Sequence, residues 1–196
     1  MQLSHEQVMA EFREAGALLD GHFVLSSGLH SGNYLQCALV LKDPWRAEKL
    51  CRALADKMRS EIPDRIDIVA SPAMGGVVVG YELGRQLGVP AIFFERVDGR
   101  FTLRRGFTIA RGANVVMVED IVTTGLSSRE CITAIREEGG HVVAAACLID
   151  RSNGRAEVGL PLVSLTRFEI PVYAADSLPP ELAAVPATKP GSRNLR

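Results

Sequence analysis

Residues 115–128 read Val-Val-Met-Val-Glu-Asp-Ile-Val-Thr-Thr-Gly-Leu-Ser-Ser, and the order of residue types in this stretch decides the fold. The apolar run Val115–Val118 is typical of a buried strand, and the carboxyl end of that strand delivers Glu119 and Asp120. The turn 123–125 comes next, and its glycine lets the backbone approach a ligand closely. A strand, an acidic pair, a turn and a helix are therefore expected in this order.

The helix is expected to begin near Ser127 or Ser128, because Ser127-Ser128-Arg129-Glu130 has the pattern of a capping box. Unpaired N–H groups at such a helix start bind phosphate, and the hydroxyls of Thr123, Thr124, Ser127 and Ser128 can add hydrogen bonds. Neither GxxxxGK[ST] nor a GxGxxG after a strand is present, which disfavours a nucleoside-triphosphatase or dinucleotide site. The adjacent acids suit the vicinal hydroxyls of a ribose. The segment therefore predicts a ribose-phosphate site, the alternative being a strand end followed by an ordinary turn.

Around this stretch, short apolar runs alternate with helical stretches, which favours a parallel sheet covered by helices. The expected elements are strands at 68–70, 91–94, 115–118 and 142–149 and helices at 76–87 and 128–138. After Asp150 the pattern offers further strands at 162–166 and 171–174, and then a proline-rich, weakly structured tail from Leu178. The predicted fold class is α/β.

The N-terminal part of the chain predicts two helices and a pair of strands. A capping-box pattern at residues 4–7 and apolar residues at near-helical spacing predict a helix over residues 5–19. Segments 22–25 and 33–41 are typical of a hairpin around a polar turn. A second helix is expected over residues 44–60, with a proline at its first position.

Composition excludes several classes of function. The chain has 196 residues and a hydrophobic content of 47%. Its net charge of -1 gives no overall electrostatic attraction to nucleic acid or to an anionic membrane. Its four cysteines are widely spaced, which predicts reduced thiols in a cytoplasmic protein rather than disulfides or a zinc site. We expect no signal peptide, and no apolar run approaches the roughly 20 residues of a membrane helix.

The stretch 115–128 resembles the motif by which type I phosphoribosyltransferases bind 5-phosphoribosyl 1-pyrophosphate (PRPP). The wider chain, from about residue 15 to 155, resembles the orotate phosphoribosyltransferase family. Residues 21–31 resemble that family's N-terminal substrate segment, and residues 71–76 resemble its pyrophosphate loop. Residues 94–106 resemble its mobile catalytic loop, and the run Leu148-Ile149-Asp150-Arg151 falls where the family has an arginine that binds the orotate carboxylate.

The resemblance implies a site, residue by residue. Asp120, Arg96 and Arg100 would be catalytic. The ribose hydroxyls would be held by Glu119 and Asp120 and the 5′-phosphate by residues 123–127, so that the PRPP-binding residues are Glu119, Asp120, Ile121, Val122, Thr123, Thr124, Gly125, Leu126 and Ser127. Orotate would contact Thr123, Arg151 and Ser26, and the pyrophosphate loop would be Ala73, Met74 and Gly75. The planar fork of an arginine suits a carboxylate, which gives Arg151 a physical reason for its role.

The implied architecture is the type I phosphoribosyltransferase fold, a mainly parallel central sheet flanked by helices, with a small hood and a flexible catalytic loop. Residues 1–196 would form a single domain, with a core at about 42–160. The hood would come from about 1–41 and 161–178, followed by a weakly structured tail at 179–196. Mg²⁺ is the implied cofactor, held mainly by substrate oxygens and waters, with no metal ligands assigned to the protein.

The arginine-rich segment 95–106 resembles a cationic flap that excludes water from the site and reaches the neighbouring subunit in a homodimer. Without the resemblance, a solvated hairpin is the simpler interpretation. The implied reaction transfers ribose 5-phosphate from PRPP to orotate, giving orotidine 5′-monophosphate and pyrophosphate in pyrimidine biosynthesis. Two alternatives stay open: a phosphoribosyltransferase for a purine or another pyrimidine, and a regulatory PRPP-binding protein without catalysis.

Overall fold

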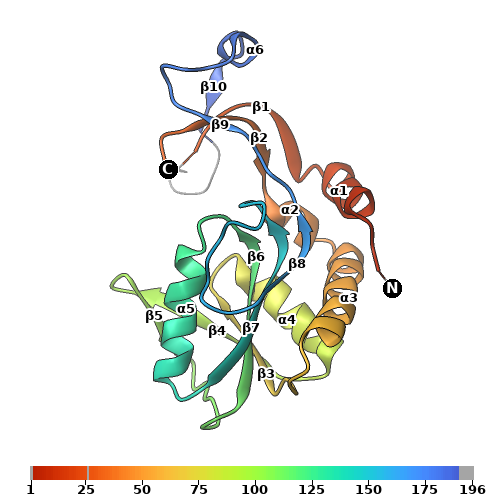
Figure 1. The fold of residues 1–196 in the computed structure, drawn as a ribbon, viewed down its shortest axis with the longest axis vertical. Helices are drawn as coiled ribbons and strands as arrows, with labels where there is room; N and C mark the ends of the chain where they lie inside the picture. Colours follow the sequence, from red (N-terminus) through yellow and green to blue (C-terminus); the bar gives the residue numbers. More distant parts are fainter. Residues whose placement is uncertain (1, 26, 190–196) are drawn as a thin grey trace.

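The central sheet determines where the candidate site residues lie. The computed structural model describes residues 2–25 and 27–189, and its larger sheet has the strand order β5-β4-β3-β6-β7-β8 (Figure 1). The strands are β3 (Ile68–Pro72), β4 (Ala91–Val97), β5 (Arg100–Leu103), β6 (Asn114–Val122), β7 (His141–Asp150) and β8 (Leu162–Arg167). Neighbouring strands are parallel except β4 and β5, which form an antiparallel hairpin. The predicted α/β class with a mainly parallel sheet is confirmed.

Helices cover both faces of this sheet. α3 (Pro44–Glu61) and α4 (Gly76–Leu87) lie on one face and α5 (Leu126–Glu137) lies on the other (Figure 1). α3 begins at Pro44 because the Asp43 carboxylate accepts hydrogen bonds from the first free N–H groups. Since both faces are covered, β6 and β7 are apolar on both sides and mostly buried. In the described ranges, no helix has the length and apolarity to cross a membrane.

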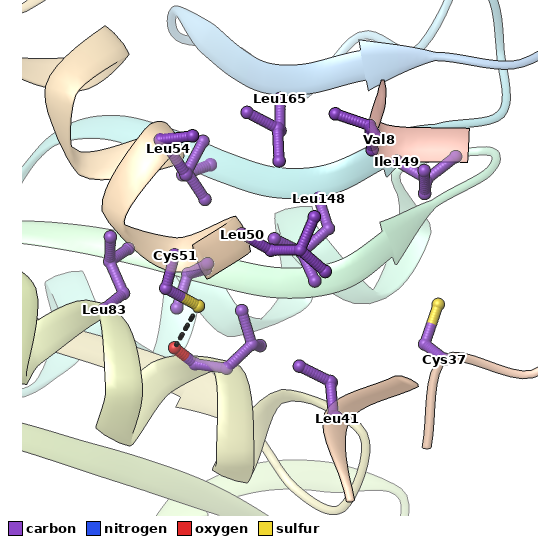
Figure 2. Packing of buried hydrophobic residues seen from close by; sticks show 14 of the residues in the cluster. Val8, Cys37, Leu41, Leu50, Cys51, Leu54, Leu83, Leu148, Ile149 and Leu165 are labelled. Atoms are coloured by element: carbon purple, nitrogen blue, oxygen red, sulfur yellow. Dashed lines mark hydrogen bonds between the residues drawn. The ribbon is translucent and has the colours of Figure 1, made fainter. Parts of the chain in front are cut away.

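Two hydrophobic clusters hold the sheet between its helices. The larger cluster lies on the α3 and α4 side, and Figure 2 shows part of it, including Leu50, Leu54, Leu83 and Leu148. Within it the Cys51 thiol donates a weak hydrogen bond to the Val79 carbonyl at 3.9 Å. The smaller cluster lies under α5 and includes Met117, Ile132 and Ile135. The end of β6 is therefore fixed from both sides by packed side chains.

A second, smaller sheet, which we call the hood, stands above the larger one in Figure 1. Its strand order is β10-β1-β2-β9, with β1 (Leu18–Val24), β2 (His30–Leu35), β9 (Val172–Tyr173) and β10 (Ala187–Thr188). The short helix α6 (Pro180–Ala183) packs near β1, and α1 (His5–Glu14) precedes β1 in the chain. α6 and β10 lie within the part of the chain for which a weakly structured tail was expected.

Two predictions for the N-terminal region are wrong. The helix expected over residues 5–19 ends at Glu14, because Gly16 takes a left-handed conformation (φ 64°) and Leu18 begins β1. The second expected strand, 33–41, ends at Leu35 and is followed by the short helix α2 (Cys37–Leu41). Periodicity alone does not separate a helix from a strand over so short an apolar run, and packing against the larger cluster favours the helix here.

Two further corrections concern the site. β6 continues to Val122, so the acidic pair lies within the strand rather than after it. α5 begins at Leu126 with Gly125 in the N-cap position, so the expected capping box is wrong. The hydroxyls of Ser127 and Ser128 instead donate hydrogen bonds to Glu119. The expected helices at 44–60 and 76–87 and the strand at 142–149 are confirmed as α3, α4 and β7.

Candidate active site

The candidate site is built around the carboxyl end of β6, which lies between β3 and β7. Because side chains alternate along a strand, Glu119 and Asp120 face opposite sides of the sheet. Glu119 accepts hydrogen bonds from Ser127 and Ser128 of α5, whereas Asp120 lies beside Gly75, at the start of α4. Burial raises the pKa of both carboxyl groups, although hydrogen bonds to each act in the opposite direction. The acidic pair therefore supplies one acid to each face.

The turn before α5 has the form of an anion-binding site. Gly125 is left-handed (φ 73°), and a Cβ there would lie 3.0 Å from Val158 Cγ1, so only glycine fits without strain. Thr123 and Thr124 are exposed, and the Leu126 N–H approaches Thr124 Oγ1 at 3.4 Å. The first N–H groups of α5 and the threonine hydroxyls are thus presented at the carboxyl edge of the sheet, as phosphate binding requires.

Arg129 stabilises this turn through hydrogen bonds. The sequence pattern did not identify Arg129 as a site residue. Its Nη1 donates hydrogen bonds to the backbone carbonyls of Thr124, at 3.1 Å, and Glu157, at 2.6 Å. Helical side chains point back toward the helix start. An arginine in the first turn of a predicted helix was therefore a signal that its side chain could reach the preceding turn. Arg129 therefore links the turn to the segment that follows β7.

The predicted pyrophosphate loop, Ala73 to Gly75, connects β3 to α4 at the same edge. The Ala73 N–H donates to the Phe94 carbonyl at 2.8 Å, the peptide bond between Ala73 and Met74 is cis, and the Met74 side chain is exposed. Gly75 has helical torsions, yet a Cβ there would lie 3.1 and 3.2 Å from the two carboxylate oxygens of Asp120. The structure therefore brings Gly75, the last residue of the predicted loop, into contact range of Asp120.

Arg151 follows β7, and its backbone N–H donates to the Val122 carbonyl at 2.8 Å. Burial lowers the pKa of its half-buried guanidinium, and Tyr34 and Cys37 act in the opposite direction. Burial raises the pKa of Tyr34, which also interacts electrostatically with Arg151 and Asp120. Tyr34 belongs to β2 of the hood, so the hood lies beside Arg151. The sequence pattern did not identify Tyr34, although a tyrosine just after the 21–31 segment was a usable signal.

The remaining predicted contacts differ in their placement. Ile121 and Val122 complete β6, and the Ile121 N–H donates to Asp120 Oδ1 at 2.9 Å. Thr123 is exposed at the start of the turn. Ser26, the third predicted orotate contact, lies outside the described residues. The edge formed by the ends of β6 and β7 thus holds most of the predicted PRPP and orotate contacts.

Segment 95–106 contains a short hairpin rather than an irregular loop. β4 and β5 are joined by the two-residue turn Asp98-Gly99, in which both residues have positive φ (48° and 82°). Glu95 on β4 forms ion pairs with Arg104 and Arg105. This geometry is that of the hairpin which the residues alone favoured.

The two arginines predicted to be catalytic have different surroundings in the hairpin. Arg96 pairs with Glu130 of α5 at 2.6 Å, donates to the Gly99 carbonyl at 2.7 Å and lies 4.2 Å above the Phe101 ring. The backbone of Arg100 pairs with Val97 in the hairpin, but its side chain is exposed and forms no hydrogen bond or ion pair with any described residue. Arg96 therefore stabilises the hairpin, whereas Arg100 is available for other contacts.

Comparison with known proteins decides the family. The family model for the phosphoribosyl transferase domain matches residues 41–172. An orotate phosphoribosyltransferase from Maricaulis maris is 57% identical over 193 residues, which cover 98% of this chain and 100% of that protein. The chain belongs to the orotate phosphoribosyltransferase family. Another orotate phosphoribosyltransferase, from Parvibaculum lavamentivorans, is 60% identical over 193 residues, with coverage of 98% and 100%.

Solved structures place this orotate phosphoribosyltransferase family member in the same fold. The orotate phosphoribosyltransferase from Aeropyrum pernix matches with a TM-score of 0.67 and 28% identity, over 82% of this chain and 93% of that one. An adenine phosphoribosyltransferase from Saccharomyces cerevisiae matches with a TM-score of 0.64 and 18% identity, over 81% and 99% of the two chains. The predicted type I phosphoribosyltransferase fold is confirmed.

Proposed function

We propose that this chain transfers ribose 5-phosphate from PRPP to N1 of orotate, giving orotidine 5′-monophosphate and pyrophosphate in cytoplasmic pyrimidine biosynthesis. Membership of the orotate phosphoribosyltransferase family supports the reaction. The observation that carries the site proposal is the closeness of Gly75 to Asp120, because a Cβ on Gly75 would lie 3.1 Å from the Asp120 carboxylate. Ribose and pyrophosphate are joined by one bond in PRPP, so their subsites must touch.

The parts of PRPP are assigned to the elements that meet at this edge. Glu119 and Asp120 hold the ribose hydroxyls, because carboxylates form strong charge-assisted hydrogen bonds with them. Residues 123–127 hold the 5′-phosphate through backbone N–H groups and hydroxyls. The loop from Ala73 to Gly75 holds the pyrophosphate. Pyrophosphate release develops positive charge on the ribose, and the nearby carboxylates stabilise it without a protein nucleophile.

Orotate is assigned to the space beside Arg151 and Thr123, under the hood, and Ser26 is the third proposed contact. The guanidinium of Arg151 can bind the orotate carboxylate with two parallel hydrogen bonds. Its partial burial strengthens this contact, because a charge pair is screened less away from water. Such a site favours an acidic pyrimidine over a neutral base.

Mg²⁺ is the cofactor we propose with PRPP. In the described ranges, no group of three or more His, Cys, Asp or Glu side chains is arranged to hold a metal ion. The oxygens of pyrophosphate and ribose are hard donors of the kind that Mg²⁺ prefers, so the substrate and water would supply most of its ligands. When bound, Mg²⁺ would neutralise charge on the departing pyrophosphate. The four cysteines are free and buried, which fits a reducing compartment.

We also propose a homodimer in which the 95–106 loop is shared between subunits. Four large apolar side chains, Trp45, Met74, Val78 and Tyr81, are exposed on α3, on α4 and on the loop before α4. Exposed apolar groups of this size on neighbouring elements are typical of a protein–protein contact. A partner on this face would lie next to the pyrophosphate loop. Light scattering should give the dimer mass for wild type and a monomer for Tyr81→Arg.

The decisive experiment follows orotate absorbance with PRPP and Mg²⁺. Wild type should consume orotate, whereas Arg151→Ala and Asp120→Asn should lose most of the activity. Arg155→Ala is the matched control, because the Arg155 side chain is exposed and pairs with Glu169 rather than with a proposed site residue. Full activity of both site variants would overturn the site assignment.

The two alternatives correspond to other outcomes of the same assay. Turnover of adenine, xanthine or uracil in place of orotate would indicate a different phosphoribosyltransferase. Binding of PRPP without turnover of any base, together with affinity for a nucleic acid, would indicate a regulatory protein.

A further inference from the structure

The side chain of Ser128 has a role that phosphate binding does not explain. Ser128 is 0% exposed, so its hydroxyl cannot reach a phosphate bound at the open turn. That hydroxyl donates a hydrogen bond to Oε2 of Glu119, and the hydroxyl of Ser127 donates to Oε1 at 2.8 Å. Two consecutive hydroxyls in the first turn of α5 thus hold both carboxylate oxygens of Glu119.

Glu119 needs these donors because of its surroundings. It is buried at the end of β6, and burial raises its pKa. The titratable and charged groups that interact electrostatically with it are Asp120 on β6, Arg96 on β4, Cys131 on α5 and Cys147 on β7. Arg96 is the cation in this set, and its guanidinium is already paired with Glu130. The serine hydroxyls are therefore the direct contacts that favour the ionised carboxylate.

We propose that Ser128 is a positioning residue, whose buried hydroxyl holds the Glu119 carboxylate in place to accept a hydrogen bond from a ribose hydroxyl of PRPP. The proposal rests on the role of Glu119 proposed above. Each carboxylate oxygen offers about two lone-pair sites, and the serines occupy one on each. One site on each oxygen is left for the substrate. Ser127 is half-buried and can serve both the phosphate and Glu119, whereas Ser128 acts through Glu119 alone.

The test is calorimetric titration of Ser128→Ala with PRPP and Mg²⁺, from neutral to acidic pH. Loss of a hydrogen bond to an ionised group should weaken PRPP binding roughly tenfold at neutral pH. The variant should also lose binding at a higher pH than wild type, because Glu119 then lacks a donor that favours its charged form. Orotate is absent from this titration, so failure of orotate turnover and failure of this proposal are separate results.

Two comparisons separate positioning from a general effect on the fold. Ser164→Ala removes a buried serine from β8, which β7 separates from Glu119 on β6, and should bind PRPP like wild type. In a Glu119→Gln background, Ser128→Ala should neither weaken binding further nor move the pH dependence. Ser128→Cys, with a weaker donor of similar size, should be intermediate and replaces Ser128→Ala if that variant does not fold. Unchanged PRPP binding in Ser128→Ala, or an equal loss in the Glu119→Gln background, would overturn the proposal.

Discussion

Gly75→Ala should lower activity with almost no effect on stability. The backbone of Gly75 is already helical (φ −56°, ψ −39°), so alanine adds no torsional strain. A Cβ would lie 3.1 Å from Asp120 Oδ1, whereas ordinary contacts begin at 3.4 Å, so the carboxylate must move by 3.4 − 3.1, or 0.3 Å. A catalytic group misplaced by about 1 Å lowers kcat/KM by about a hundredfold. On the same scale, moving the Asp120 carboxylate by about 0.3 Å should lower kcat/KM by about fourfold.

The stability terms of this substitution nearly cancel. Alanine restricts the unfolded chain, which stabilises the fold by about 0.4–1 kcal/mol, and it is less favourable than glycine at a helix N-cap by a similar amount. The Tm should therefore change by no more than about 4 °C. Gly32→Ala is the matched control, because a Cβ there meets nothing closer than 4.0 Å. Wild-type kcat/KM in Gly75→Ala, or a large fall in its Tm, would refute the reasoning from Asp120.

Three further predictions concern specificity, packing and pH. Arg151→Lys should raise the KM for orotate about tenfold while leaving the KM for PRPP nearly unchanged, because lysine cannot bind a carboxylate with two parallel hydrogen bonds; equal changes in both KM values would contradict this. Gly80→Ala should destabilise the protein by about 1–3 kcal/mol in urea unfolding, because its Cβ would lie 2.6 Å from a buried serine hydroxyl. Burial alone would raise the pKa of Glu11, but Lys49 and Arg46 outweigh it and lower the pKa below its ordinary 4.5. The stabilisation of the folded state by the ionised Glu11 is therefore complete above pH 4.5 and is lost as the pH falls below that value. The difference in unfolding free energy between wild type and Glu11→Gln should accordingly shrink on acidification.

Local signals allowed the central part of the fold to be predicted. α4 was placed correctly at 76–87, and its end coincides with a local signal, Gly88 in a left-handed conformation (φ 74°). The acidic pair and the Thr-Thr-Gly turn were likewise recognised from residue order alone. Such signals act over a few residues, so they are visible in the chain itself.

Contacts between distant segments explain what the sequence did not reveal. The serines of α5 fit a capping box, but a buried glutamate without donors would cost more than an uncapped helix end, so they bind Glu119 instead. Tyr34 became a candidate only when the hood was seen beside Arg151. Arg129 became one only through its bonds to the turn and to Glu157.

The pairing of an N-terminal segment with a C-terminal segment in the hood bears on the order of folding. β1 pairs with β10, and the ring of His22 bonds to the Val185 carbonyl at 2.8 Å across a separation of 163 residues. Closing so long a loop early costs much conformational entropy, and the parallel sheet between the two segments shortens that loop as it forms. The hood is therefore expected to assemble last during folding and to open first in hydrogen exchange, while the strands beneath it stay protected. Its local opening would then admit a ligand without unfolding the catalytic core.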